Sequence, residues 1–133
     1  MRRVFADSFY FFALLSEDDS QHQQAVDFTA HYQGKLVTTG WVITEVADGL
    51  GRPPWRIAFL ALHAKLVQKS QVHIEPCTDQ LMNAGLKLYR QRLDKAWSLT
   101  DCISFVVMER AGIREALTGD HHFEQAGFAA VLK

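Results

Sequence analysis

The chain has 133 residues, of which 48% are hydrophobic and 22% are charged, and its formal net charge at pH 7 is −1. This length and composition are typical of one globular domain, residues 1–133, with enough apolar material for a core. No stretch is long enough to span a bilayer, and the start of the chain lacks a signal-peptide cleavage site, so we expect a cytoplasmic protein without a membrane partner.

Short apolar segments alternate with helical segments in the first part of the chain. Residues 4–6 predict a buried strand that ends at Asp7, and residues 9–15 predict an apolar helix. Ser20 can cap a second helix, and residues 36–38 predict a second strand. Asp7 therefore follows the carboxyl end of a strand, where open α/β sheets bind their ligands.

Residues 41–50 predict a helix that carries two acidic side chains. Its core-facing stripe consists of Val42, Val46 and Leu50. Glu45 is one position from this stripe, whereas Asp48 lies about 200° around the helix axis from Val46. We therefore expect Glu45 to be the carboxylate that faces inward.

The middle of the chain is basic. Residues 1–50 carry a net charge of −4, residues 51–100 one of +5, and residues 101–133 one of −2. The basic side chains of the middle segment are Arg52, Arg56, Lys65, Lys69, Lys87, Arg90, Arg92 and Lys95. They suit a positive surface that holds a polyanion over an acidic pocket, although two amphipathic helices with solvated basic faces explain the same charges.

Two helices and a strand are predicted in this basic segment. Pro54 suits the first turn of a helix that runs to about Lys69, and residues 72–74 predict a third strand. Thr78 is a plausible N-cap for a helix over residues 79–93. The predicted inward side chains of that helix are Met82, Leu86, Tyr89 and Leu93.

The last third of the chain predicts a central helix and two strands. The helix begins near Thr100 and is apolar on almost every side, residues 116–118 form a strand that ends at Gly119-Asp120, and residues 129–132 form a last strand. Strands that alternate with helices predict the α/β class, as a three-layer α/β/α sandwich with a mainly parallel central sheet.

Four acidic residues stand beside these apolar segments: Asp7, Glu45, Asp101 and Asp120. Asp7 and Asp120 each follow a strand, and Glu45 and Asp101 lie in the first turns of helices, so all four can meet at one edge of a parallel sheet. Carboxylates gathered beside a core raise one another's pKa unless a cation neutralises them. Hard oxygen ligands without a cysteine or histidine cluster select Mg²⁺ or Mn²⁺, the usual ions for hydrolysing phosphodiesters.

Each of these residues has a simpler explanation when it is taken alone. The segment from Ser98 to Asp101 is a serviceable capping box, Glu45 could be a surface acid, and Asp120 could be a turn residue. Ser104 lies on the same helix face as Asp101, with Thr100 just before, so both hydroxyls could hold the carboxylate, a water or a phosphate. Ser104 could equally satisfy a backbone carbonyl.

Histidine and cysteine offer no clear site. His121 and His122 adjoin Asp120, but adjacent histidines point in different directions and nothing else completes a nitrogen-rich site, so the sequence does not favour a ligand role for either. Cys77 and Cys102 are far apart and lack a metal-ligand spacing, which predicts free thiols in a reducing cytoplasm.

Four segments stand out in chain order: Phe5-Ala6-Asp7-Ser8, Thr44-Glu45-Val46, Leu99-Thr100-Asp101-Cys102-Ile103-Ser104 and Leu117-Thr118-Gly119-Asp120-His121-His122-Phe123. In this order and at these spacings they resemble the PIN domain family, over essentially the whole chain. The resemblance implies a metal-dependent ribonuclease fold with one or two Mg²⁺ or Mn²⁺ ions. Asp7 and Asp101 would be the main metal ligands, Glu45 and Asp120 would complete the acidic site, and Thr100 and Ser104 would be supporting groups.

Free-standing domains of this size are similar to the VapC-type toxins of toxin–antitoxin pairs, which cut RNA, commonly dimerise and are restrained by a small antitoxin. We therefore expect an endoribonuclease for single-stranded RNA, with an antitoxin and a second copy of the chain as partners. The alternative is a PIN-like module that binds RNA or protein without cleavage, which the loss of a motif acid would favour. A third hypothesis is phosphoryl chemistry on an aspartate of the chain itself, as in receiver or haloacid-dehalogenase-like domains. Those domains need a second acid close to the first, and Phe9 stands where the dehalogenase pattern has an aspartate.

Overall fold

The computed structural model describes all residues, 1–133, and has at its centre a five-stranded, all-parallel sheet with the strand order β3-β2-β1-β4-β5. In chain order the elements are β1 (Arg3–Ala6), α1 (Ser8–Leu15), α2 (His22–His31), β2 (Lys35–Thr39), α3 (Gly40–Gly49), α4 (Trp55–Gln68), β3 (Val72–Glu75), α5 (Asp79–Gln91), α6 (Leu99–Ala111), β4 (Glu115–Leu117), α7 (His121–Gln125) and β5 (Ala129–Ala130).

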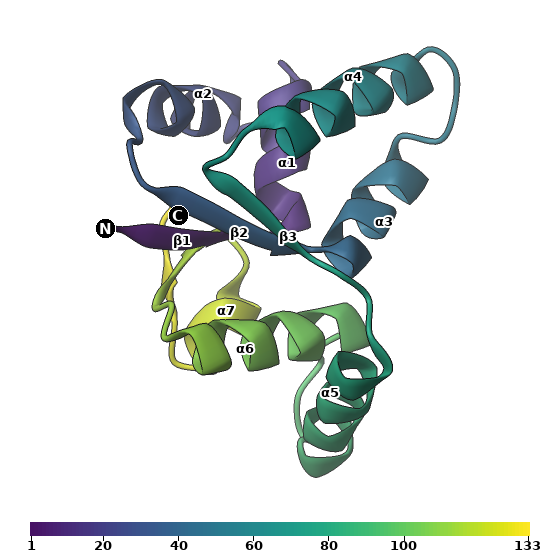
Figure 1. Ribbon diagram of the computed structural model, residues 1–133, viewed down its shortest axis with the longest axis vertical. Coiled ribbons are helices and arrows are strands. Elements are labelled where there is room, and N and C mark those ends of the chain that lie inside the picture. Colours follow the sequence, from purple (N-terminus) through teal and green to yellow (C-terminus); the bar gives the residue numbers. More distant parts are fainter.

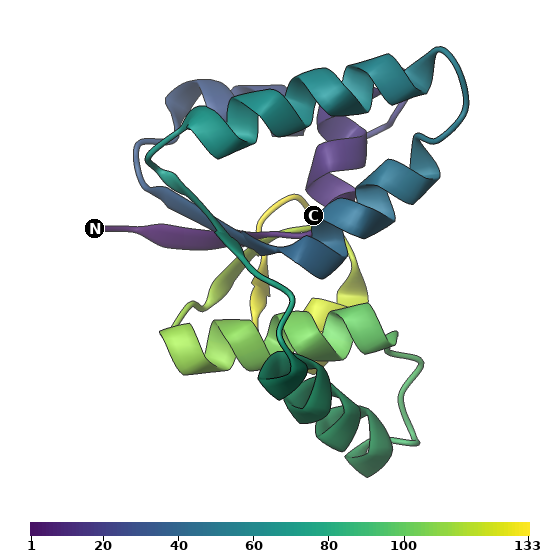
Figure 2. The same ribbon diagram turned by 45° about the vertical axis from the view of Figure 1, so that its right-hand side comes forward.

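The helices cover both faces of the sheet. Figures 1 and 2 show α1, α2 and α4 on one side, with α3 leading from the end of β2 toward α4, and α5, α6 and α7 on the other side. The predicted three-layer α/β/α sandwich with a parallel sheet is therefore confirmed. None of the helices combines the length and the apolar character that crossing a membrane requires.

The central strand β1 owes its place to its sequence. Val4, Phe5 and Ala6 have no exposed surface, because a strand in the middle of a parallel sheet is covered on both faces and so needs a continuous apolar run. Its register pairs Ala6 with Leu117 of β4. The residues that follow, Asp7 and Thr118, therefore leave the sheet side by side at its carboxyl edge.

The start of α2 differs from the prediction. The helix begins at His22 rather than next to Ser20, and the residue at its N-cap position, Gln21, makes no side-chain capping bond. The reason is a turn before the helix, in which the Asp19 carboxylate accepts a hydrogen bond from the Gln21 N–H at 2.8 Å. An aspartate that bonds the backbone two residues on is a common turn device.

The inward face of α5 was predicted correctly only in part, because Met82 and Leu86 are partly buried but the other two predicted side chains are not. Tyr89 is 47% exposed and Leu93, beyond the end of the helix, is 84% exposed, whereas Leu81 and Gly85 are buried. The cause is the contact with α6: a Cβ atom on Gly85 would lie 2.3 Å from Cγ1 of Ile103. The missing side chain lets α6 approach that face of α5, and this leaves Tyr89 on the solvent side of the helix.

The basic middle segment is divided by the sheet. Its basic residues up to Lys69 belong to α4 and its flanking residues, and those from Lys87 onward belong to α5 and the loop after it. These two helices lie on opposite sides of the sheet (Figures 1 and 2). The positive charge therefore does not form one continuous surface.

Candidate active site

The candidate site begins where β1 and β4 end. Asp7 is only 5% exposed, and the Thr118 hydroxyl donates a hydrogen bond to its Oδ2 atom at 2.9 Å. Thr118 is fully buried, so this bond forms away from solvent. Parallel strands bring the two residues together from positions 111 apart in the chain.

Burial dominates the electrostatics of Asp7. It raises the pKa of the carboxyl group from 3.8 to about 7, against the hydrogen bond from Thr118, which lowers the pKa. The negative charge of Asp101 raises it further, the Ser8 backbone N–H lowers it, and the charge of Glu45 adds a smaller increase. A cation bound beside a carboxyl group in such surroundings favours its ionised form and lowers this pKa.

Asp101 both caps α6 and faces its neighbours at the site. Its Oδ2 atom accepts the Ser98 N–H at 3.1 Å, and its own N–H donates to the Ser98 hydroxyl at 3.0 Å, so the predicted capping box is confirmed. The same Oδ2 atom lies 3.1 Å from Nδ1 of His122. The capping role therefore does not compete with a role at the site, because the Oδ1 atom has no hydrogen-bond partner within the protein.

Asp120 is tied to both of these acids. Its N–H donates to the Thr118 hydroxyl at 3.0 Å, which in turn donates to Asp7. Its Oδ1 atom accepts the His122 N–H at 2.9 Å, and its Oδ2 atom lies 3.4 Å from the ring nitrogen that contacts Asp101. Asp7, Asp101 and Asp120 are therefore joined by one continuous set of polar contacts.

Glu45 completes the group from α3. Its side chain is partly buried and makes no hydrogen bond or ion pair, but its charge acts on Asp7. Asp48, on the same helix, is exposed, as the stripe formed by Val42 and Val46 predicts.

The two hydroxyl residues of α6, Thr100 and Ser104, make no side-chain hydrogen bond to the four acids. Ser104 is fully buried and donates its hydrogen bond to the Thr100 carbonyl at 2.9 Å, the role that the sequence left open for it. Thr100 is partly buried next to Asp101. Support of the acidic group by these two residues stays a prediction.

Sequence reasoning missed Thr118 and His122. Thr118 ends an apolar strand two residues before Asp120, and a polar side chain in that position was the signal that could have identified it. His122 is the second of two histidines, and only its contacts distinguish it from His121. Nothing in the chain order indicates which of the two turns inward.

The four acids offer the oxygen donors that a hard divalent cation prefers, while the potential ligand atoms that lie within 4.8 Å of one another are those of Asp120, His121 and His122. Four carboxylates supply only oxygen atoms: Asp7, Glu45, Asp101 and Asp120. Asp7 is buried, and its raised pKa reflects a negative charge that lacks a compensating positive one. Mg²⁺ and Mn²⁺ prefer such ligands, so the residues present suit the ion that the sequence predicts.

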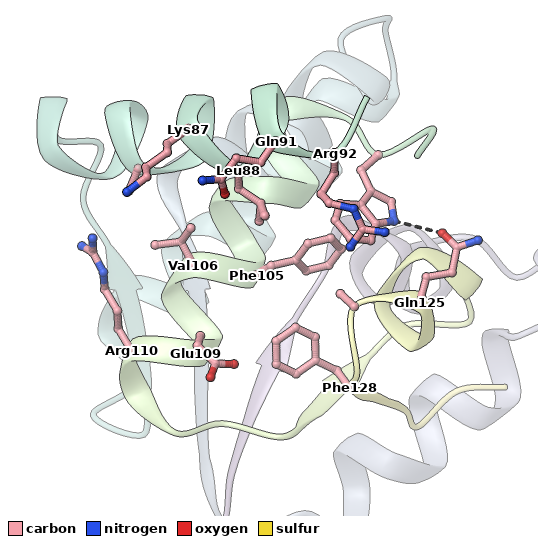
Figure 3. A pocket seen from close by; sticks show the side chains of 13 residues that line it. Lys87, Leu88, Gln91, Arg92, Phe105, Val106, Glu109, Arg110, Gln125 and Phe128 are labelled. Atoms are coloured by element: carbon pink, nitrogen blue, oxygen red, sulfur yellow. Dashed lines mark hydrogen bonds between the residues drawn. The ribbon is translucent and has the colours of Figure 1, made fainter. Parts of the chain in front are cut away.

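Two of the hollows on the protein lie away from these acids. The one in Figure 3 has a volume of about 530 Å³ and lies between α5, α6 and α7, where Trp97 donates a hydrogen bond to Gln125 at 2.9 Å. A groove of about 730 Å³ runs between α1, α2 and α4 and is mostly apolar. None of the four acids lines either hollow, so the acidic group is a separate site.

Comparisons with known proteins agree with this fold. Residues 4–129 match the PIN domain family. The 23S rRNA-specific endonuclease VapC20 of Mycobacterium tuberculosis, from strains CDC 1551 / Oshkosh and H37Rv, is 27% identical over 128 residues, which are 96% of this chain and 97% of that protein.

Two crystal structures are similar to this one. That of Mycobacterium tuberculosis VapC20, a sarcin-ricin loop cleaving toxin, has a TM-score of 0.86 at 26% identity and covers 95% of this chain and 96% of its own. That of FitAcB from Neisseria gonorrhoeae has a TM-score of 0.66 at 14% identity, covers 96% and 94%, and shows a likeness of fold alone.

Proposed function

The chain belongs to the PIN domain family, and from this premise we propose that it is a divalent-metal-dependent endoribonuclease, the toxin of a VapBC-type toxin–antitoxin pair. One observation carries the proposal: Asp7, Asp101 and Asp120 come from three separate segments and are linked by hydrogen bonds at the carboxyl edge of the sheet. Nothing in the packing of the core requires three carboxylates there, whereas a bound divalent ion would explain why they lie together.

The residues of the site have three roles in this proposal. Asp7 and Asp101 hold Mg²⁺ or Mn²⁺, and Glu45 and Asp120 complete the acidic site. The ion, when bound, lowers the pKa of water and neutralises charge that develops on the phosphoryl group. The Thr118 hydroxyl fixes one oxygen of Asp7, so that the other keeps a defined direction.

RNA is the substrate in this proposal, and VapC20 suggests where to look first. That relative is a 23S rRNA-specific endonuclease, so ribosomal RNA is the first defined substrate to test after a mixed single-stranded pool. Basic residues of one of the two groups, at α4 or at α5, would contact the phosphate backbone, because the two groups lie on opposite sides of the sheet. A cytoplasmic location follows from such a substrate and is part of the proposal.

An antitoxin and a second copy of the chain are the proposed protein partners. The apolar groove between α1, α2 and α4 offers an antitoxin a concave surface, with Lys65 and Lys69 among the residues that line it. On its other side, α4 carries exposed apolar side chains, which we assign to a homodimer interface: Ile57, Leu60 and Val67. Exposed apolar surface of this kind marks sites of association.

The first experiment compares the wild type with Asp101→Asn on a mixed single-stranded RNA pool, with Mn²⁺, Mg²⁺ or a chelator. The substitution keeps the oxygen that accepts the Ser98 N–H and removes the charge. Asp48→Asn is the matched control, because Asp48 is exposed on α3. We expect the wild type and the Asp48→Asn control to cleave RNA only when Mn²⁺ or Mg²⁺ is present. Asp101→Asn should not cleave RNA under any of these conditions.

Two results would contradict the proposal. Cleavage that survives Asp101→Asn would mean that the site lies elsewhere or that another nuclease is present. RNA binding by the wild type without cleavage of the pool or of ribosomal RNA would favour the alternative, a PIN-like binding module.

A further inference from the structure

The ring of His122 lies between two of the acidic residues. Its Nδ1 atom is 3.1 Å from Oδ2 of Asp101 and 3.4 Å from Oδ2 of Asp120, and its side chain is 19% exposed. A carboxylate can only accept a hydrogen bond, so Nδ1 carries the hydrogen and donates it to Asp101. The contact joins residues from two elements, α6 and α7.

The backbone of His122 is bound to the same site. Its N–H donates to Oδ1 of Asp120 at 2.9 Å, and Asp120 is itself bound to Thr118 through its own N–H at 3.0 Å. His122 therefore holds Asp120 through its main chain and Asp101 through its ring. Rotation of the His122 ring would break its hydrogen bond to Asp101 and with it the link between the two acids.

His121 provides an internal comparison. It is next in the chain and its side chain is 66% exposed. Its Nδ1 atom is 3.6 Å from Oδ1 of Asp120, an oxygen that already accepts the His122 N–H, and it contacts no second acid. The two neighbours thus have the same chemistry but only one of them connects two carboxylates.

We propose that His122 is a positioning residue, which sets the distance and orientation of Asp101 and Asp120 for the divalent ion. The inference rests on the proposed function, since it assigns the ion to these carboxylates. Two carboxylates repel each other in the absence of the ion, and a donor between them opposes that repulsion. Because the ring occupies Oδ2 of Asp101, Oδ1 is the oxygen left for the metal.

This role predicts which measured quantity changes. Partners that orient a metal's ligands typically contribute about 10- to 100-fold in metal affinity or activity. Loss of the His122 contact should raise the Mn²⁺ concentration needed for half-maximal binding and cleavage by about that factor. The KM for RNA at saturating Mn²⁺ should stay within about twofold, because His122 acts through the acids.

The test uses a pair of nearly isosteric substitutions. His122→Leu removes the donor, whereas His122→Asn keeps one, because the amide nitrogen of asparagine is bonded to Cγ as Nδ1 is in histidine. His121→Leu is the matched control on the neighbouring residue. Mn²⁺ binding to each free protein is measured by electron paramagnetic resonance, and thermal unfolding monitors the fold.

We expect His122→Leu to bind Mn²⁺ about 10- to 100-fold more weakly, His122→Asn to recover most of the affinity, and His121→Leu to match the wild type. Equal Mn²⁺ affinity in the wild type and His122→Leu would overturn the proposal. So would an Asn variant as weak as the Leu variant with the fold intact, since the donor would then not matter.

Failure of the proposed function gives a different pattern. A wild-type protein that binds Mn²⁺ and cuts no RNA refutes the nuclease, yet the binding series still decides the role of His122. A wild-type protein that cuts RNA and binds no Mn²⁺ overturns the positioning role, because no ion is there to be positioned.

Discussion

Asp7 is 5% exposed, and burial raises the pKa of its carboxyl group from 3.8 to about 7. In the absence of metal the ionised group opposes folding, because it has left water without gaining a cation. The unfolded chain loses this proton near pH 4 and the folded chain near pH 7. Stability without metal should therefore fall as the pH rises from about 4 to about 7 and change little above that, with a cost of up to about 4 kcal/mol.

Asp7→Asn tests this cost. The amide oxygen can still accept the Thr118 hydroxyl, and no charge is buried. We expect the variant to be more stable than the wild type by about 2 to 4 kcal/mol at pH 8 in chelator, to lose this advantage near pH 4, and to cut no RNA. Urea unfolding at both pH values is the measurement, with the exposed Asp48→Asn unchanged. A wild type equally stable across this range would contradict the raised pKa.

Thr118 is a second residue whose effect can be isolated. Thr118→Val leaves Oδ2 of Asp7 and the Asp120 N–H without their partner, which should cost about 2 kcal/mol of stability and weaken Mn²⁺ binding. Thr38→Val is the control, because that buried hydroxyl donates only to the Ala6 carbonyl at 2.7 Å. Both variants should unfold more easily, measured by urea, but only Thr118→Val should change Mn²⁺ affinity.

At the scale of the elements, the contact between α5 and α6 shows how a neighbour can override a sequence pattern. Periodicity alone allows several faces of α5 to turn inward, and the sequence prediction chose the one with the largest side chains. The structure buries Leu81 and Gly85 most deeply, where α6 packs closely, and leaves Met82 and Leu86 partly buried beside them. Close packing over a glycine outweighed the burial of larger apolar groups.

Gly85→Ala should therefore destabilise the protein, although alanine is the better helix former by about 1 kcal/mol. The added methyl group meets Cγ1 of Ile103 at 2.3 Å and the Ile103 backbone at 3.3 Å, so α5 and α6 must separate. We expect a net loss of about 1 to 2 kcal/mol in urea unfolding. Asn83→Ala, exposed on the same helix, should be neutral or slightly stabilising; a stable Gly85→Ala variant would show that the interface can yield.

At the scale of the whole molecule, α4 is apolar on two sides. One side lines the groove with α1 and α2, where Leu66 is buried, and the other carries Ile57 at 74%, Leu60 at 57% and Val67 at 58% exposure. A helix that is apolar all round is normally buried on all sides. The outer side of α4 is thus the part of the molecule that lacks a partner within the chain.

Leu60→Glu tests the proposed dimer. Light scattering after size exclusion should give a dimer for the wild type and a monomer for the variant, because a charge buried in an apolar interface is costly. Gln80→Glu adds the same charge to an exposed position of α5, on the opposite face of the sheet, and should remain dimeric. Mn²⁺ affinity should be equal in all three proteins, and a monomeric wild type would rule out this interface.

The sequence by itself determined the α/β class, the order of the strands and helices except for the short helix α7, and the N-caps at Thr78 and Ser98. These features depend on local patterns: apolar runs for buried strands, and a hydroxyl before the first turn of a helix. It also singled out four acids, because an ionised carboxylate beside an apolar core destabilises the fold unless a cation compensates its charge. These acids are Asp7, Glu45, Asp101 and Asp120.

Only the tertiary structure decided how these acids are connected. The Thr118 hydroxyl reaches Asp7 because β1 and β4 are neighbours, and His122 rather than His121 reaches Asp101 because of the way α7 packs against α6. The inward face of α5 was decided in the same way, by the approach of Ile103 to Gly85. Each of these contacts joins segments distant in the chain, so its energy depends on which elements meet, and no local pattern contains that information.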